Sequence, residues 1–232
     1  MRYPVLILVV GAVACRTGRI TNSGTPATSG EVKAALRVVN TSPDAAPLDV
    51  LVGNNVVISD LAFGDVSAAA SVPAGTQQVA FRPSGGSTGP ATELTFTGGD
   101  TTTVLTVDSS TVINPWVLTD TGAVVSAGYS KLRAVNFAAA APSLLAWRTQ
   151  PDVPLFVTIQ FPFPYQTASP YLQSNPGNWQ ILIATEAYDN GVPIVTDTLA
   201  LSDLIDIPDG ESRTVIITDD GEGGVKLVVI NP

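Results

Sequence analysis

Residues 36–53 read Leu-Arg-Val-Val-Asn-Thr-Ser-Pro-Asp-Ala-Ala-Pro-Leu-Asp-Val-Leu-Val-Gly and contain two predicted strands with a turn between them. The apolar, β-branched runs at 36–40 and 48–52 predict the strands. Pro43 fixes φ, and the Asp44 carboxylate can accept backbone amides, so residues 42–45 predict the turn. This unit of short strand and tight turn sets the pattern of the remaining chain.

Short apolar runs and turn residues continue to alternate up to residue 118, and no long amphipathic helical pattern interrupts them. Many short strands at regular spacing are typical of an antiparallel sandwich or barrel. We therefore predict an all-β fold. The further predicted strands are 56–58, 69–72, 77–81, 94–96, 103–107 and 112–118.

The sequence also repeats itself. Leu36-Arg-Val-Val-Asn40 returns as Leu132-Arg-Ala-Val-Asn136, and the Pro-Ala-Gly segment at 73–79 resembles residues 176–181. A repeat of this length predicts two tandem domains, each of about a hundred residues. The junction near residues 128–130 is too short for a flexible linker, so we expect the domains to pack together. The predicted domains are residues 31–129 and 130–232.

Residues 36–53, together with Leu61-Ala-Phe-Gly-Asp-Val66 and Val72-Pro-Ala-Gly75, resemble the bacterial family called domain of unknown function 4397. The resemblance covers residues 34–125 and is looser in the second half, where Ala138–140 replace Ser-Pro-Asp and Leu145 replaces Asp49. It implies an immunoglobulin-like antiparallel β-sandwich in each half. It also implies export, frequent lipidation and tandem domains, and it implies no activity.

The N-terminus resembles the export signal of a bacterial lipoprotein. Arg2 is followed by an unbroken apolar run at 5–14, which ends directly before Cys15. Ten helical residues span only ~15 Å, about half of a hydrocarbon core, which suits a signal peptide better than a spanning helix. We predict a signal peptide at 1–14 and lipidation of Cys15. The alternatives are an ordinary cleaved signal or an uncleaved short anchor.

Residues 15–30 follow as a flexible tether rich in Ser, Thr, Gly and Pro. An acylated Cys15 at its start would hold the chain on the lipid bilayer. The predicted location is therefore the bacterial cell envelope, on its periplasmic or surface side. Arg16 stands where an Asp would signal inner-membrane retention, which favours the outer membrane.

The composition excludes most enzyme classes. The chain has no His, one Cys and a net charge of −9. Without His, the usual proton shuttle and the commonest metal ligand are absent. The acidic charge argues against nucleic acid, and no dinucleotide or Walker motif is present. We expect no enzyme activity, no cofactor and no metal site.

Two patterns carry possible chemistry. Gly85-Gly-Ser-Thr-Gly89 matches a nucleophile motif, but that motif needs a strand-to-helix elbow and a His base, so a simple loop is expected. Acidic residues crowd the last third of the chain, where solvated turns are expected; calcium binding and a carboxylate hydrolase are the alternatives. These acids are Asp203, Asp206, Asp209, Glu211, Asp219, Asp220 and Glu222.

An aromatic segment is the most suggestive feature. Phe161-Pro-Phe-Pro-Tyr165 cannot form a helix, and its prolines exclude a central strand, so we predict an extended or turned loop. Its rings either pack over the second domain or form a docking surface, because aromatics on a stiff backbone lose little entropy on binding. The candidate partner-binding residues are Phe161, Phe163, Tyr165, Trp147 and Trp179.

The sequence therefore favours a non-enzymatic, membrane-anchored envelope lipoprotein that acts through protein contacts, as an accessory or structural subunit of a larger assembly. The alternative is a carbohydrate-binding surface module, in which Trp147, Tyr165 or Trp179 would be exposed stacking platforms.

Overall fold

The computed structural model describes residues 31–43, 46–107, 113–119, 124–141, 143–151 and 153–231. For residues 153–158, 160 and 161 it describes the backbone alone. The predicted signal peptide and tether, including Cys15, lie outside the described residues. Residues Glu31–Pro232 form one compact unit.

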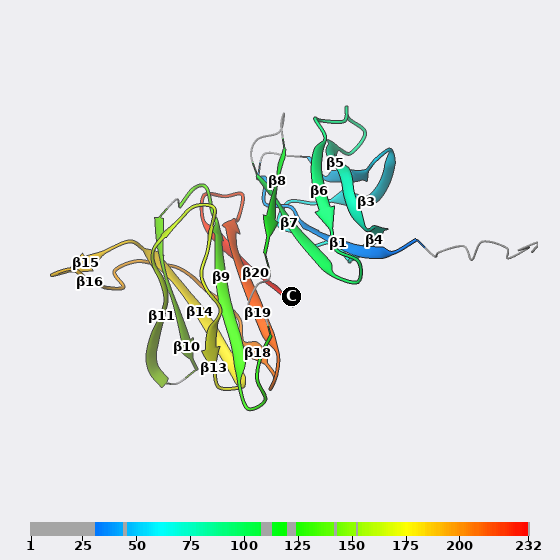
Figure 1. The fold of residues 1–232 in the computed structure, drawn as a ribbon. Helices are drawn as coiled ribbons and strands as arrows, with labels where there is room; N and C mark the ends of the chain where they lie inside the picture. The colour runs from blue at the N-terminus through cyan, green and yellow to red at the C-terminus, as the bar shows by residue number, and fades with distance from the viewer. Residues whose placement is uncertain are drawn as a thin grey trace, which may run out of the picture. The chain divides into compact units, whose positions relative to one another are not determined.

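Every regular element formed by the described residues is a strand, which confirms the predicted all-β fold. Strands β1–β8 form two four-stranded sheets, called here the first sandwich, with strand orders β4-β1-β7-β8 and β3-β2-β5-β6 (Figure 1). The strands are β1 (Lys33–Val39), β2 (Leu48–Val52), β3 (Asn55–Leu61), β4 (Ala70–Pro73), β5 (Gly75–Pro83), β6 (Thr92–Phe96), β7 (Thr101–Val107) and β8 (Asn114–Leu118).

Strands β9–β20 form the second sandwich, except that β15 and β16 pair with each other in a separate two-stranded sheet. One sheet has the order β12-β9-β19-β20, with β13 also on β9, and the other has the order β11-β10-β14-β17, with β18 also on β14. The strands are β9 (Ser130–Phe137), β10 (Ser143–Gln150), β11 (Val153–Pro164), β12 (Thr167–Ala168), β13 (Leu172–Ser174), β14 (Gly177–Thr185), β15 (Tyr188–Asp189), β16 (Val192–Pro193), β17 (Thr198–Leu201), β18 (Ile205–Ile207), β19 (Ser212–Asp219) and β20 (Val225–Ile230).

Each sandwich has its own apolar core. The core of the first is built from residues between Ala34 and Ile113, and the core of the second from residues between Leu132 and Ile217. Side chains alternate between the two faces of a strand. On β1, Leu36 and Val38 therefore enter the first core, while Val39 faces the other way and belongs to a third apolar cluster.

The sheets differ from the expected antiparallel pairing in one respect. The first strand of each sandwich pairs in parallel with a late strand: β1 with β7, and β9 with β19. In both sandwiches this late strand then forms an antiparallel hairpin with the last strand, β8 or β20. The same unusual pairing in both halves shows that they share one topology.

A buried asparagine occupies the same place in both sandwiches. The Asn40 side chain donates from Nδ2 to the Leu61 carbonyl at 3.0 Å and accepts the Ser42 N–H at 3.1 Å. Asn136 donates to the Phe163 carbonyl at 2.8 Å and accepts the Ala138 N–H at 3.0 Å. The repeat seen in the sequence is therefore a repeat of hydrogen bonds.

A serine contact is repeated as well. The Ser67 hydroxyl accepts the Val38 N–H at 2.9 Å, and the Ser169 hydroxyl accepts the Ala134 N–H at 3.1 Å. Each serine also donates its own N–H to the carbonyl of the same partner residue. These contacts hold the chain against β1 and β9 at matching positions.

The third apolar cluster joins the two sandwiches. Leu105 and Leu118 of the first sandwich and Val135, Phe137 and Ile216 of the second are buried together in it. The Trp116 and Phe137 rings meet edge to face, with centroids 5.0 Å apart. Aromatic pairs in this geometry contribute beyond their buried area.

Candidate functional site

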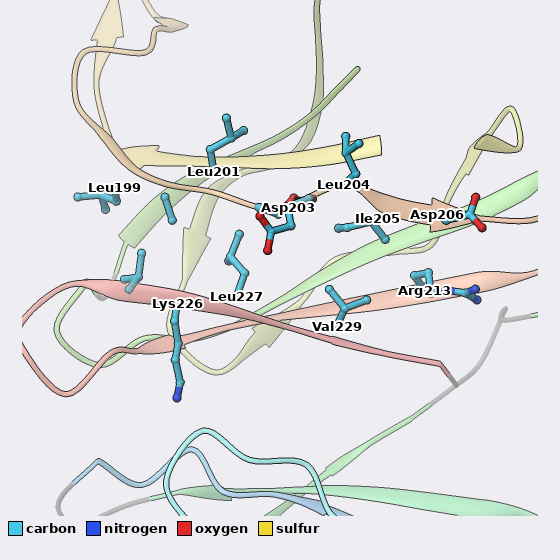
Figure 2. A pocket seen from close by; sticks show the side chains of 13 residues that line it. Leu199, Leu201, Asp203, Leu204, Ile205, Asp206, Arg213, Lys226, Leu227 and Val229 are labelled. Carbon is cyan, nitrogen blue, oxygen red and sulfur yellow. Dashed lines mark hydrogen bonds between the residues drawn. The ribbon is translucent and has the colours of Figure 1, made fainter. Parts of the chain in front are cut away.

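The candidate site is a groove on the second sandwich, between the β17–β18 segment and β20 (Figure 2). Its volume is about 580 Å³. In Figure 2, Leu227 and Val229 point from β20 toward the β17–β18 segment, while Lys226 points the opposite way. Most of the lining is aliphatic, and the apolar residues are Leu199, Ala200, Leu201, Leu204, Ile205, Val225, Leu227 and Val229.

Ser202 shapes the side of the groove formed by β17 and β18. Its N–H donates to the Ile181 carbonyl, and its hydroxyl accepts the Ile181 N–H at 2.9 Å and donates to the Asp203 carbonyl at 2.7 Å. The serine thus replaces regular strand pairing for one residue and separates β17 from β18. The chain bends there, and Leu201 and Leu204 are left exposed.

The β19–β20 hairpin fixes the other side. The Asp220 carboxylate accepts the N–H groups of Glu222 and Gly224 at 2.7 and 2.8 Å. These backbone hydrogen bonds, first that of Glu222, hold the pKa of Asp220 below its usual value. The two hydrogen bonds to Asp220 close the turn between β19 and β20, and β20 starts directly after it at Val225.

Some charged side chains around the groove have a partner within the protein and others have none among the described residues. Arg213 is paired with Glu211 at 2.7 Å. Lys226 donates to the Phe63 carbonyl at 3.4 Å and lies over the Phe63 ring. Asp203 makes no ion pair with any residue that the structure describes, and Figure 2 shows its carboxylate pointing toward β20. The groove therefore presents an acidic side chain beside an apolar floor.

The first sandwich is more tightly closed at the corresponding place. The registers Val104–Val117 and Val215–Val229 align β8 with β20, so Ile113 is the counterpart of Val225. Ile113 is buried in the first core, whereas Val225 is only partly buried against the second and lines the groove. The alignment of β8 with β20 thus shows that the groove is present in the second sandwich at a position that is closed in the first.

The aromatic segment is a strand and not the predicted loop. Residues 161–164 belong to β11, which pairs only with β10 and is an edge strand among the described residues, where prolines are tolerated. Phe163 is fully buried in the second core and is the counterpart of Leu61, because its carbonyl accepts the Asn136 side chain. The prolines therefore indicated an edge position rather than a loop.

The other candidate rings also pack inside the protein. Trp147 and Trp179 are buried, and the Trp179 indole donates to the Asn175 carbonyl at 2.9 Å. Tyr165 is half-buried with its ring 5.9 Å from that of Phe137, and the Phe161 side chain lies outside the described residues. Phe163, Trp147 and Trp179 thus present no exposed stacking platform, which removes the support for carbohydrate binding at both tryptophans.

Several acids of the last third have structural contacts. Asp209 accepts the Gly128 N–H at 2.6 Å, and Asp219 accepts the N–H groups of Ala139 and Ala140 at 3.1 and 2.9 Å. Gly210 and Gly221 have positive φ, as turns require. The Gly85–Gly89 motif is a loop after β5. These residues shape turns.

Among the described residues, no group of three or more acidic or cysteine side chains could hold a metal ion. No helix in the described part of the chain is long and apolar enough to cross a membrane.

Sequence reasoning did not single out the groove. Leu199 and Leu227 lie on different sheets, and only the folded sandwich brings them into one groove. The signal that could have found it is the comparison of β8 with β20, because matched positions carry different residues. The sequence predicts solvated turn positions for Asp203 and Asp206, whereas both residues line the groove.

Residues 34–146 match the family model described as Domain of unknown function (DUF4397). Residues 34–146 are therefore similar to a DUF4397 domain. This match confirms the resemblance found in the sequence. The DUF4397 match begins at the second residue of β1 and continues through β8 and β9 into β10.

Comparison with curated proteins found no match. Among solved structures, a leucine-rich repeat protein from Bacteroides thetaiotaomicron is similar over 81% of this chain, with 10% identity and a TM-score of 0.23. The chain spans 26% of the length of that protein.

Proposed function

We propose that the protein is a non-enzymatic, lipid-anchored accessory subunit of the bacterial cell envelope, which binds a protein partner through the groove of the second sandwich. The anchor is acylated Cys15, and residues 16–30 connect it to the folded part. The observation that carries the binding role is the apolar groove between β17–β18 and β20, flanked by exposed Leu201 and Leu204. Apolar surface lined by a few charged groups is typical of interaction sites.

Photo-crosslinking in the source bacterium tests the binding role. A photoreactive amino acid replaces Val229 or Leu201 at the groove, which are 42% and 52% exposed. The matched control is Val56 on β3, which is 45% exposed on the first sandwich. We expect one protein adduct from both groove positions and none from Val56. Equal adducts from all three positions, or no adduct at all, would contradict the proposal.

The anchor is tested separately with Cys15→Ser. We expect the wild-type chain in the membrane fraction, with the intact mass of a triacylated polypeptide that begins at Cys15. The variant should leave the membrane fraction while its fold, followed by circular dichroism, remains unchanged. An unmodified Cys15 thiol in the mature wild-type chain would overturn the anchor.

A further inference from the structure

Strand β20 ends its sheet with an unpaired edge. In the described residues it pairs with β19 alone. In an antiparallel pair, backbone groups point alternately toward and away from the partner strand. The Asp220 N–H donates to the Gly224 carbonyl at 3.1 Å, which sets the alternation at the start of the hairpin. The N–H and C=O groups of Val225, Leu227 and Val229 therefore point away from β19.

The first sandwich supports this assignment. The registers place Pro115 of β8 where β20 has Leu227, since they pair with Thr106 and Ile217 at matching positions of β7 and β19. Proline has no N–H and fits a strand only where that group would face outward. A proline on an edge strand also prevents another strand from pairing there. The edge is thus blocked in the first sandwich and open in the second.

The open edge borders the apolar groove. Leu199, Val225 and Leu227 pack against the second core but remain partly exposed in the groove. An extended segment beside β20 would place alternate side chains on this apolar floor. Backbone hydrogen bonds and side-chain pockets would then act on the same segment, as in peptide recognition by strand addition.

The charged side chains of the groove indicate what kind of segment could bind in it. Asp203 and Asp206 line the groove, while Arg213 and Lys226 are engaged with Glu211 and Phe63. The chain as a whole has a net charge of −9, so a second copy would be repelled. Lys226 points away from the groove, whereas the Asp203 carboxylate points toward β20 (Figure 2), so Asp203 favours a cationic partner segment.

We propose that the groove receives an extended segment of another protein, which pairs with the free edge of β20, places alternate aliphatic side chains in the groove and directs a Lys or Arg toward Asp203. This inference rests on the proposed function and names the class of its partner.

Binding of a synthetic peptide to the purified full chain tests the proposal. The probe is a fluorescein-labelled peptide, Val-Thr-Lys-Thr-Val-Thr-Val-Thr, whose valines and lysine share one face, and its binding is followed by fluorescence anisotropy. Two further versions carry N-methyl groups on either the odd or the even residues, because only one set of N–H groups faces β20. We expect one N-methylated version to bind on the order of tenfold more weakly and the other to bind nearly as well.

A matched pair of protein variants tests the edge. Val229→Pro removes an outward N–H from β20, and Val117→Pro makes the equivalent change on β8, where Val117 is 41% exposed. Neither change removes a hydrogen bond to the neighbouring strand. We expect peptide affinity to fall on the order of tenfold for Val229→Pro and to stay unchanged for Val117→Pro. Thermal unfolding confirms that both variants fold.

Amide hydrogen exchange gives an independent readout on the unmodified chain. Bound peptide should slow exchange at Val225, Leu227 and Val229. Asp203→Asn should weaken binding several-fold for the lysine peptide and leave binding unchanged for a version with glutamine in place of lysine.

Three results would overturn the proposal: affinity independent of both N-methylation and Val229→Pro, no added protection on β20, or a dimer that forms through this edge. A groove crosslink in cells combined with any of these results would retain the binding function and reject strand addition. Loss of the crosslink together with intact peptide binding would reject the function instead.

Discussion

At matched positions of the two sandwiches, β8 has Pro115 and β20 has Leu227, while the buried asparagines Asn40 and Asn136 make the same hydrogen bonds. The asparagine side chains, which make hydrogen bonds within each sandwich, are thus the same in both halves. The residue at the edge, which decides whether a further strand can pair there, differs between them. The comparison teaches that binding capacity can be added to a repeated fold at its edge, without altering its interior.

The outer faces of the sandwiches differ in a second way. Asp49 and Arg82 are cross-strand partners on β2 and β5, with an ion pair of 2.6 Å. The matching partners on β10 and β14 are Leu145 and Ala184, which are buried with Trp147 in an apolar cluster. An ion pair in one half therefore corresponds to apolar packing in the other.

The largest expected effect concerns the shared asparagines. Asn40→Ala leaves the Leu61 carbonyl without its side-chain donor, and Asn136→Ala does the same to the Phe163 carbonyl. We expect each change to lower the free energy of unfolding by about 2–4 kcal/mol. The loss should be greater for Asn40, which also accepts the Thr106 hydroxyl at 3.0 Å.

Urea unfolding with linear extrapolation measures these losses. Asn54→Ala, on the exposed turn after β2, is the control and should change stability by less than about 0.5 kcal/mol. An Asn136→Ala variant as stable as the control would show that the two halves do not depend on the same hydrogen bonds.

A medium effect is expected on the outer face. Arg82→Ala should cost about 1–3 kcal/mol, because it leaves the Asp49 carboxylate with only the Asp60 N–H and the Ser84 hydroxyl. The double change Asp49→Leu with Arg82→Ala copies the pair of the second sandwich and should be close to neutral. Equal losses for the single and double variants would contradict this expectation.

The same pair predicts a pH dependence. Hydrogen bonds from Arg82 are the main reason why the pKa of Asp49 lies below its usual value. A lowered folded-state pKa stabilises the fold above the unfolded value of about 3.9, and this contribution is lost as the pH falls through the folded pKa. Between pH 7 and pH 3, the double variant should therefore lose less stability than the wild type in denaturant titrations.

The smallest effect on stability is expected from Pro115→Leu. This change restores an outward N–H on β8 and should alter the free energy of unfolding by less than about 1 kcal/mol. In the Val229→Pro background it should restore weak binding of the labelled peptide, measured by anisotropy. No restored binding would show that an open edge is insufficient without the apolar groove.

Much of the fold could be predicted because it depends on local patterns. The recurrence of Leu-Arg-x-Val-Asn located β1 and β9, and Gly75 and Gly177 begin β5 and β14 as the repeated Gly segment suggested. Both glycines have positive φ, which other residues adopt with strain. The repeated glycine in the sequence therefore marks the position where the backbone requires a positive φ.

The candidate site could not be predicted in the same way. The prolines beside Phe163 predict a loop and leave both inward packing and a docking surface open, whereas an edge strand accepts prolines and directs Phe163 into the core. The groove depends on the distance between sheets at residues 199 and 227, which no local pattern encodes. The Pro115–Leu227 difference becomes visible only after strand registers align the halves.

The parallel pairs β1–β7 and β9–β19 also bear on the order of folding. Ala35 of β1 pairs with Thr101 of β7, and Lys131 of β9 pairs with Ser212 of β19. Neither pair can form until its later residue has been synthesised. Contacts between such distant residues are slow to form because a long loop must close first. Neither sandwich can therefore complete this sheet while its own late strand is still being synthesised.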